Sequence, residues 1–145
     1  MREREGPLAS PGYHLWQAAL RWKNAVKTSL EKHELTPTQF FVLGAAGWLT
    51  KTSPQPPKQR EVAEMAGLDL MTTSQVVRAL EKAGLLARHD DPHDSRTWRV
   101  SPTEQGRRVL KDAASAVRGA DAAFFGRLGA KTDGVVDALA RLSSD

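Results

Sequence analysis

Residues 58–106 decide the fold of this chain, and they read KQREVAEMAGLDLMTTSQVVRALEKAGLLARHDDPHDSRTWRVSPTEQG. Apolar residues recur at helical spacing in two segments, so the stretch predicts one helix over 60–66 and a second over 70–83. Gly67 follows the first helix as a stop that can take a positive φ, and Gly84 ends the second. A tight turn lets two such helices cross, which is typical of a helix-turn-helix.

The second predicted helix has an apolar face and a polar face. Its inner face carries Thr73, Val76, Val77 and Leu80. The opposite face holds uncharged hydrogen-bonding groups near its start and cations further along, namely Met71, Ser74, Gln75, Arg78 and Lys82. Glutamine can bond two atoms of an adenine, and arginine can bond a guanine or a phosphate, so the face suits the major groove of DNA. Taken alone, such a stripe is more often a solvated helix surface.

A charged hairpin is predicted after the second helix, with strands over 85–89 and 96–100. The hairpin gathers three arginines, Arg88, Arg96 and Arg99. A guanidinium on an exposed loop suits a narrow minor groove with its strong negative potential. We expect Asp94 to orient Arg96 through a charge-assisted hydrogen bond. Taken alone, an ordinary surface turn with a weak exposed ion pair explains the hairpin equally well.

Four motifs follow one another in this part of the chain: Gln59-Arg60-Glu61-Val62-Ala63, Leu80-Glu81-Lys82-Ala83-Gly84-Leu85, Asp91-Pro92-His93-Asp94-Ser95-Arg96 and Thr103-Glu104-Gln105-Gly106. Their order and spacing resemble the MarR family of bacterial transcriptional regulators. Members of that family commonly read Q-x-E-L-A, L-E-x-x-G-L, D-P-x-D-x-R and T-x-x-G at these places. Residues 35–40 are similar to the start of that family's second helix. Two residues depart from the family pattern: Arg99, where an apolar residue is commoner, and Pro102, where many members have Leu.

Composition agrees with a small DNA-binding protein. The 145 residues suit a single domain and leave no room for a separate catalytic module. The formal net charge of +4 favours a polyanionic partner. The chain has no cysteine, which excludes disulfides, thiolate zinc sites and cysteine-based peroxide sensing. The charged start and the lack of an apolar run near the roughly 18 residues of a membrane span predict no signal peptide or anchor, and we expect a cytoplasmic, nucleoid-associated protein.

Helices are also predicted on both sides of this centre. Residues 13–33 repeat apolar residues at helical steps, and a capping box at Thr36–Gln39 starts another helix that ends near Thr50. A connector with three prolines, residues 52–57, joins it to the helix-turn-helix.

The C-terminal part predicts a long helix and a short one. The long helix begins at a cap that is either Ser101 or, by the family resemblance, Thr103, and it continues to about Leu128. The short helix follows Thr132. These apolar stripes exceed what one small core requires, so we expect a homodimer, although they could also fold back on the first helix in a monomer. The resemblance implies that the first, fifth and sixth helices form the dimer interface and place the two reading helices one turn of DNA apart.

A ligand pocket is predicted from aromatic and polar residues near the start of the chain and on the second helix, namely Tyr13, His14, Trp16, Arg21 and Trp48. The resemblance implies a small aromatic or anionic effector there, while the alternative is that the aromatic residues are core and the polar ones solvated. A divalent metal at His89 and His93 with the neighbouring aspartates is a weaker alternative, since a polar turn explains the same residues. We find no phosphate-binding glycine loop and no motif that pairs a nucleophile with a base. We therefore expect no enzyme, no cofactor and no bound metal.

The sequence thus predicts a mainly α chain with a small β-hairpin wing, a winged helix-turn-helix flanked by N- and C-terminal dimerisation helices. Residues 1–145 form one subunit, with a DNA-binding lobe over 36–101 and a dimerisation region over 10–34 and 102–145. We expect a homodimeric repressor that binds a pseudo-palindromic operator of double-stranded DNA. The predicted DNA contacts are Met71, Thr72, Ser74, Gln75, Arg78, Asp94, Arg96 and Arg99. The alternative is a winged-helix protein-interaction module whose basic face contacts an acidic partner.

Overall fold

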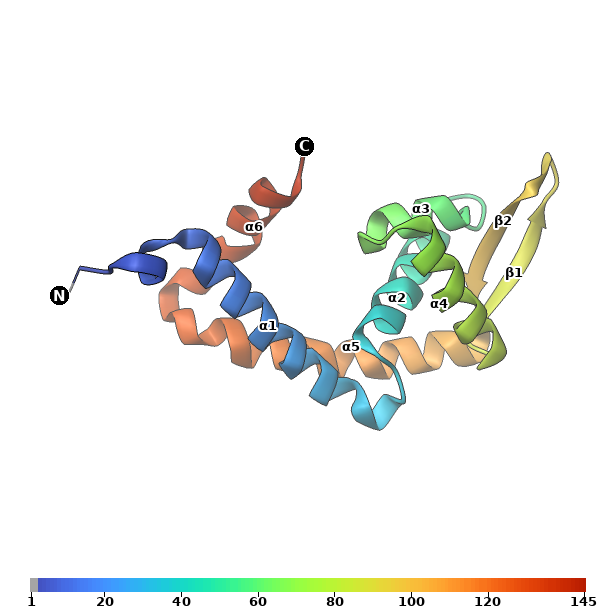
Figure 1. The fold of residues 1–145 in the computed structure, drawn as a ribbon. Helices are drawn as coiled ribbons and strands as arrows, with labels where there is room; N and C mark the ends of the chain where they lie inside the picture. Colours follow the sequence, from blue (N-terminus) through green and yellow to red (C-terminus); the bar gives the residue numbers. More distant parts are fainter. Residues whose placement is uncertain (1–2) are drawn as a thin grey trace. The chain divides into compact units, whose positions relative to one another are not determined.

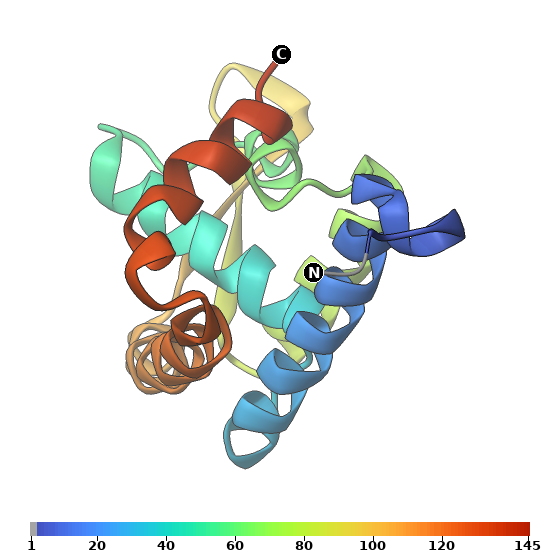
Figure 2. The same cartoon turned by 90° about the vertical axis from the view of Figure 1, so that its left-hand side faces the viewer.

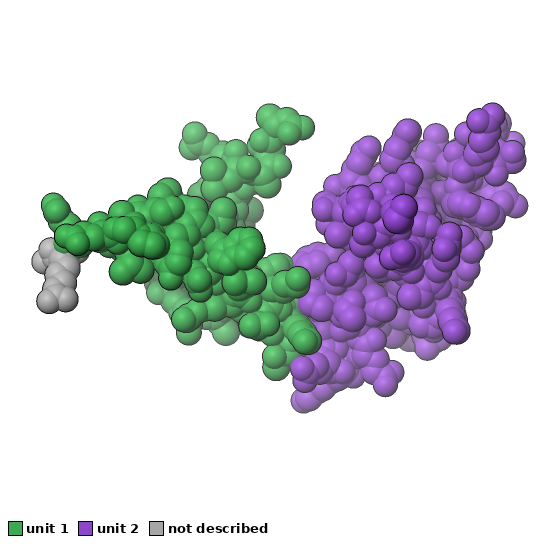
Figure 3. Space-filling model, viewed as in Figure 1, with its two compact units in different colours: residues 1–29, 116–145 green, residues 30–115 purple. Residues whose placement is uncertain are grey.

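The computed structural model describes residues 3–145 and divides the chain into two compact units. Figure 3 distinguishes unit 1, Met1–Ser29 with Ala116–Asp145, from unit 2, Leu30–Ser115. Unit 2 contains all of the predicted DNA-binding lobe and also residues 102–115.

Unit 2 is built on α2, against which the helix-turn-helix packs. In chain order it holds η2 (Glu31–His33), α2 (Pro37–Thr52), α3 (Gln59–Ala66), α4 (Leu70–Lys82), β1 (Leu86–Asp91), β2 (Asp94–Pro102) and the first turns of α5 (Glu104–Phe125). Both α3 and α4 contact α2, and the hairpin of β1 and β2 stands beside α4 (Figure 1). The core between these elements is aliphatic, with Val42, Leu43, Val62, Val77, Leu80, Leu86 and Val100 buried.

Local signals in the sequence account for where these helices begin and end. The predicted capping box of α2 is confirmed: Thr36 Oγ1 accepts from the N–H of Gln39 at 3.1 Å, and Gln39 Oε1 accepts from the N–H of Thr36 at 3.0 Å. Gly67 closes α3 with the predicted positive φ of 71°. Gly84 follows α4 with φ 78°.

Helical spacing over 60–66 places Val62, Met65 and Ala66 on one apolar face, and the structure differs from this pattern at Met65. Met65 is 50% exposed, because α3 turns its Val62 and Ala63 edge into the core instead.

The wing is a two-stranded antiparallel sheet that is tied to the connector before α3. His89 pairs with Arg99 across the hairpin, and the register shifts between Asp90 and Asp91. The backbone of Lys58 forms an isolated antiparallel β-bridge with the backbone of Arg99. The N–H of Val100 donates to the carbonyl of Pro57 at 3.0 Å. The proline-rich connector therefore runs alongside β2.

Unit 1 is helical throughout its regular structure. It holds η1 (Gly6–Ala9), most of α1 (Pro11–Leu30), the later turns of α5, η3 (Gly126–Gly134) and α6 (Val135–Ser143). Trp22 Nε1 donates to Asp121 Oδ1 at 2.7 Å, which joins α1 to α5. Figure 2 shows η3 leading from the end of α5 into α6. The long helix stops at Phe125, short of Leu128, because 3-10 turns follow and Gly129 has φ 60°.

The predicted class, a mainly α chain with a small β-hairpin wing, is confirmed. None of the helices formed by residues 3–145 is long and apolar enough to span a bilayer.

Candidate nucleic-acid interface

The start of α4 is held by an aspartate that the sequence analysis did not single out. Asp69 Oδ1 accepts from the N–H of Thr72 at 2.7 Å, and Oδ2 accepts from Thr72 Oγ1 at 2.8 Å. The hydrogen bonds from Thr72, the backbone one foremost, lower the pKa of Asp69, so the carboxylate is charged at neutral pH. The hydroxyl of Thr72, a predicted DNA contact, is used in this cap in the free protein.

The faces of α4 lie as the sequence predicts except at Val76, which was expected on the inner face and is only half-buried. Thr73, Val77 and Leu80 are buried, and Thr73 Oγ1 donates to the carbonyl of Asp69 at 2.8 Å, which satisfies the buried hydroxyl. On the other side Met71 is 74% exposed. Gln75 and Arg78 are exposed and Ser74 is half-buried. The helix therefore presents an amide, a guanidinium and an apolar side chain to solvent over two turns.

An arginine of β1 fixes the wing to the end of α4. Arg88 donates to Glu81 through Nε at 3.0 Å and through Nη2 at 3.1 Å, a bidentate pair. Its guanidinium also lies 4.9 Å from the centre of the Trp98 ring. The hydrogen bond from Arg88 lowers the pKa of Glu81. Arg88 is therefore a structural residue of the wing.

The wing tip is ordered by two aspartates that bind backbone. Asp91 Oδ1 accepts from the N–H of His93 at 2.8 Å. Asp94 Oδ1 accepts from the N–H of Arg96 at 3.0 Å, and its Oδ2 accepts from Thr97 Oγ1 at 3.0 Å. Asp94 thus holds the backbone at Arg96, where the sequence analysis expected a bond to the guanidinium. Arg96 itself is exposed.

The guanidinium of Arg99, a predicted DNA contact, has partners inside unit 2. Its Nε donates to Asp91 Oδ2 at 3.0 Å, and its Nη1 donates to the carbonyl of Pro56 at 2.6 Å. Asp91 is buried and the Arg99 side chain is only 15% exposed. The N–H of His93 and the charge of Arg99 lower the pKa of Asp91. We correct the expectation for Arg99: its guanidinium joins β1, β2 and the connector, and so is not free to reach DNA.

The Thr103-x-x-Gly106 motif joins α5 to the end of α4. Thr103 is the cap of α5, since its Oγ1 accepts from the N–H of Gly106 at 2.9 Å. The same hydroxyl donates to the carbonyl of Gly84 at 2.6 Å, and the N–H of Thr103 donates to the carbonyl of Leu85 at 3.0 Å. Gly106 lies so close to that carbonyl that a Cβ would overlap it. Of the two caps considered, Thr103 is therefore the one used.

Three of the polar side chains of the wing, those of His89, Asp91 and Asp94, lie against neighbouring protein groups. His89 Nε2 lies 2.9 Å from Ser101 Oγ, and Asp91 and Asp94 accept the bonds described above. Across residues 3–145 no three His, Asp or Glu side chains gather closely enough to hold a metal ion.

A mainly apolar cavity of about 520 Å³ lies in unit 2 between α2, the end of β2 and the start of α5. Its apolar wall is formed by Phe40, Trp48, Pro102, Leu110 and Ala114. Gly47 packs closely against the opposite wall, since a Cβ there would lie 2.8 Å from Leu110 Cδ2. Thr50 Oγ1 is buried at this cavity without a hydrogen-bond partner in the described chain. Three cations, Lys51, Arg107 and Lys111, complete the lining.

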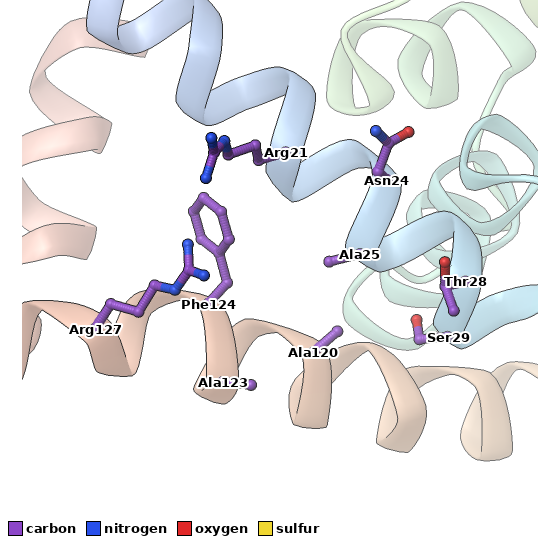
Figure 4. A pocket seen from close by; sticks show the side chains of 9 residues that line it. All are labelled: Arg21, Asn24, Ala25, Thr28, Ser29, Ala120, Ala123, Phe124 and Arg127. Atoms are coloured by element: carbon purple, nitrogen blue, oxygen red, sulfur yellow. The ribbon is translucent and has the colours of Figure 1, made fainter.

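The five residues predicted to form a ligand pocket lie in different places. Trp48 lines the cavity of unit 2, whereas Arg21 lines a groove of about 710 Å³ in unit 1. There, Arg21 and Arg127 both point toward the ring of Phe124 (Figure 4). Tyr13 packs edge-on against His14, whose Nε2 lies 2.8 Å from the carbonyl of Leu8. Trp16 is exposed.

Sequence reasoning missed Asp69, Thr50 and the cations around the cavity. An aspartate directly before a helix, three residues ahead of a threonine, is a capping signal that could have identified Asp69. The cavity brings together residues more than fifty positions apart, so no local signal could have found it.

Several known proteins are similar to this chain in sequence and in fold. The model of the MarR family matches residues 35–98. The uncharacterized HTH-type transcriptional regulator YdcH of Bacillus subtilis (strain 168) is 35% identical over 120 residues, which are 83% of this chain and 81% of that protein.

Two solved structures of another regulator are also similar. The transcriptional repressor CouR bound to a 23-mer DNA duplex matches with a TM-score of 0.82 and 27% identity, over 99% of this chain and 100% of that chain. CouR from Rhodococcus jostii RHA1 bound to p-coumaroyl-CoA matches with a TM-score of 0.80 and 29% identity, over 95% and 92% of the two chains.

Proposed function

The chain belongs to the MarR family of transcriptional regulators, and on that premise we propose that it is a homodimer that represses promoters by occupying a short pseudo-palindromic operator. The observation that carries the proposal is the exposed face of α4 beside an ordered wing whose Arg96 is free to reach outward. A repressor of similar fold, CouR, has been solved on a DNA duplex. Such a protein acts in the cytoplasm, in association with the nucleoid.

The side chains of the interface divide the contacts to DNA between the major and the minor groove. Gln75 and Arg78 read base edges in the major groove, with Met71 against a thymine methyl and Ser74 on a base or a phosphate. Arg96 enters the minor groove from the wing, where the negative potential is strongest. Asp94 supports this contact, because its carboxylate accepts from the backbone N–H of Arg96.

Selection of bound fragments from a pool of random duplexes tests this function directly. We expect a two-fold related motif whose half-sites are about one helical turn apart. Gln75→Ala should change the preferred base at one position of each half-site. Arg96→Ala should weaken specific binding by about 1–3 kcal/mol without altering the melting temperature. Arg118→Ala, an exposed cation of α5 outside the reading face, is the control. A selection that enriches no motif would reject the proposal.

We propose further that the cavity between α2 and α5 binds the effector. Its apolar wall suits an aromatic or acyl group, and its cations suit a carboxylate or phosphate of the same ligand. The hydroxyl of Thr50 would gain a hydrogen-bond partner from a polar atom of the ligand. A regulator of similar fold has been solved with p-coumaroyl-CoA.

Trp48 provides the measurement for effector binding, because it lines the cavity. Titration with p-coumarate and p-coumaroyl-CoA should quench its fluorescence, and Thr50→Val should weaken binding by about 1–3 kcal/mol. By thermodynamic reciprocity, the ligand should bind less tightly to the operator complex than to the free protein. Equal affinities would show that an occupied cavity does not regulate DNA binding.

The alternative function is a winged-helix module that contacts an acidic protein. Many phosphate contacts produce a steep fall of affinity with salt, whereas a protein partner need not. A DNA affinity that is weak and depends little on salt would favour this alternative.

A further inference from the structure

We propose that a groove between the wing and the start of α3 binds one phosphodiester of the DNA backbone, at a point that the base-reading residues of α4 do not touch. This wing–α3 groove occupies about 290 Å³ and includes Lys58, Gln59, Arg60, Leu70, Arg96 and Trp98 in its lining. The inference rests on the proposed DNA-binding function and assigns it a further contact.

The groove has an excess of positive charge. Lys58 and Arg60 come from the start of α3, and Arg96 comes from the wing. The carboxylate in the lining, that of Asp94, already accepts from the N–H of Arg96 and from Thr97 Oγ1. Three cations around one bound carboxylate favour an added anion.

The local structure fixes the backbone that carries Lys58 before any ligand arrives. The backbone of Lys58 forms a β-bridge with the backbone of Arg99 in β2. The N–H of Lys58 donates to Glu61 Oε1 at 3.1 Å. The backbone at the start of α3 is therefore fixed against the wing. The positive end of that helix adds to the attraction for a phosphate.

Gln59 offers a further polar group that could serve the same ligand. Gln59 Oε1 is buried without a hydrogen-bond partner within the described chain, and Gln59 lines the groove. A half-turn of the terminal amide exchanges its oxygen for its NH₂ group, which can donate to a phosphate oxygen. The phosphate would thus give the amide of Gln59, a half-buried residue, a partner that the free protein does not supply.

The apolar lining favours a backbone phosphodiester over a free phosphate ion. Leu70 is 52% exposed and Trp98 is 41% exposed, and both line the groove. A deoxyribose next to the bound phosphate can cover such side chains, whereas an inorganic phosphate cannot. The position beside Arg96 places the contact next to the minor groove that this arginine enters.

Scanning the selected operator with single neutral methylphosphonates tests the contact. For the wild-type dimer we expect one phosphate in each half-site whose neutralisation weakens binding roughly fivefold to tenfold. The double variant Lys58→Gln/Arg60→Gln should bind more weakly, keep the same base preferences and be insensitive to neutralisation at that phosphate. Its slope of log affinity against log salt should become shallower by about 0.9 for each phosphate that the variant no longer neutralises.

Controls separate this contact from net charge and from folding. Arg108→Gln/Arg118→Gln makes the same charge change on exposed positions of α5 and should leave the methylphosphonate pattern of the wild type. Arg60→Gln alone changes an exposed side chain and serves if the double variant fails to fold. Inorganic phosphate should compete with the duplex no better than chloride of equal ionic strength.

Three outcomes overturn the inference. If the double variant retains the wild-type methylphosphonate pattern, the groove does not hold a phosphodiester. If inorganic phosphate competes specifically, the groove is a site for the free ion. If the wild type selects no duplex, the proposed function fails together with this contact, whereas the first two outcomes leave that function standing.

Discussion

Gly106 shows how one residue decides the junction between two helices. A Cβ at this position would overlap the carbonyl of Leu85, which already accepts from the N–H of Thr103. A methyl group would push α5 away from the end of α4 and break the bonds that Thr103 makes to Gly84 and Leu85. The requirement is steric, because Gly106 lies inside a helix with ordinary backbone angles.

Gly106→Ala should therefore lower the free energy of unfolding, by about 1–3 kcal/mol for an overpacked site. Gly119→Ala in the same helix is the matched control, since nothing lies within 4 Å of a Cβ there. That change should raise stability by about 0.5–1 kcal/mol through helix propensity alone. Urea denaturation compares the two variants, and equal effects would remove the steric explanation.

At the scale of elements, the cap of α4 should make stability depend on pH. The pKa of Asp69 is lowered in the folded state by its bonds to Thr72. A depressed pKa contributes stability above the unfolded value, near 3.9, and that contribution is lost as the pH falls through the folded value. The reading helix should thus be stabilised by its cap at neutral pH and weakened in acid.

Asp69→Asn tests this dependence, because asparagine caps helices about as well but does not titrate in this range. The variant should unfold with similar free energy at pH 7 and should lose less stability than the wild type between about pH 4 and pH 2. Denaturation series at stepped pH values measure the difference. Parallel curves would show that the cap contributes nothing to acid sensitivity.

The wing should behave as an element whose orientation depends on Arg99. The bonds of the Arg99 guanidinium to Asp91 and to the carbonyl of Pro56 hold β1, β2 and the connector together. Arg99→Met keeps the length of the side chain and removes these bonds, so amide exchange at Val100 should become faster. Specific DNA affinity should fall, and adding Arg96→Ala should cause less than an additive loss, since both changes act through the wing. Fully additive losses would argue for separate roles.

At the scale of the whole molecule, unit 1 leaves many large apolar side chains uncovered. They include Leu15, Trp16, Leu20, Leu128, Val136, Leu139 and Leu142. Surfaces of this kind in a small protein are typical of subunit interfaces. A second copy of the chain is the partner in the proposed function, since a two-fold related operator requires two reading heads.

Val136→Glu should split the dimer, because Val136 is 76% exposed on α6 and a carboxylate cannot be buried there without a partner. Sedimentation should show a monomer at micromolar concentration, and operator affinity should fall by more than about tenfold as the second half-site loses its effective concentration. Met65→Glu, an exposed apolar position of α3, is the control and should leave the dimer intact. If the Val136→Glu variant sediments as a dimer, α6 does not belong to the dimer interface.

Much of the helix-turn-helix and of α2 could be predicted, because the sequence signals for where these helices begin, end and face are local. The capping box at Thr36, the positive φ of Gly67 and the two faces of α4 follow from residues within four positions of one another. Backbone hydrogen bonding and helical periodicity act over this range, so they can be recognised in the sequence without the tertiary structure.

The roles of individual side chains at the site depended on partners far away in the chain. Arg99 reads as a free cation in the sequence, yet its guanidinium donates to the carbonyl of Pro56, 43 positions away. The cavity at Thr50 and the wing–α3 groove each join segments that only packing brings together. By itself the sequence determined the helix-turn-helix, the capping box of α2 and the family. Only the tertiary structure decided which arginines remain free, because an ion pair depends on distances in space and not on spacing along the chain.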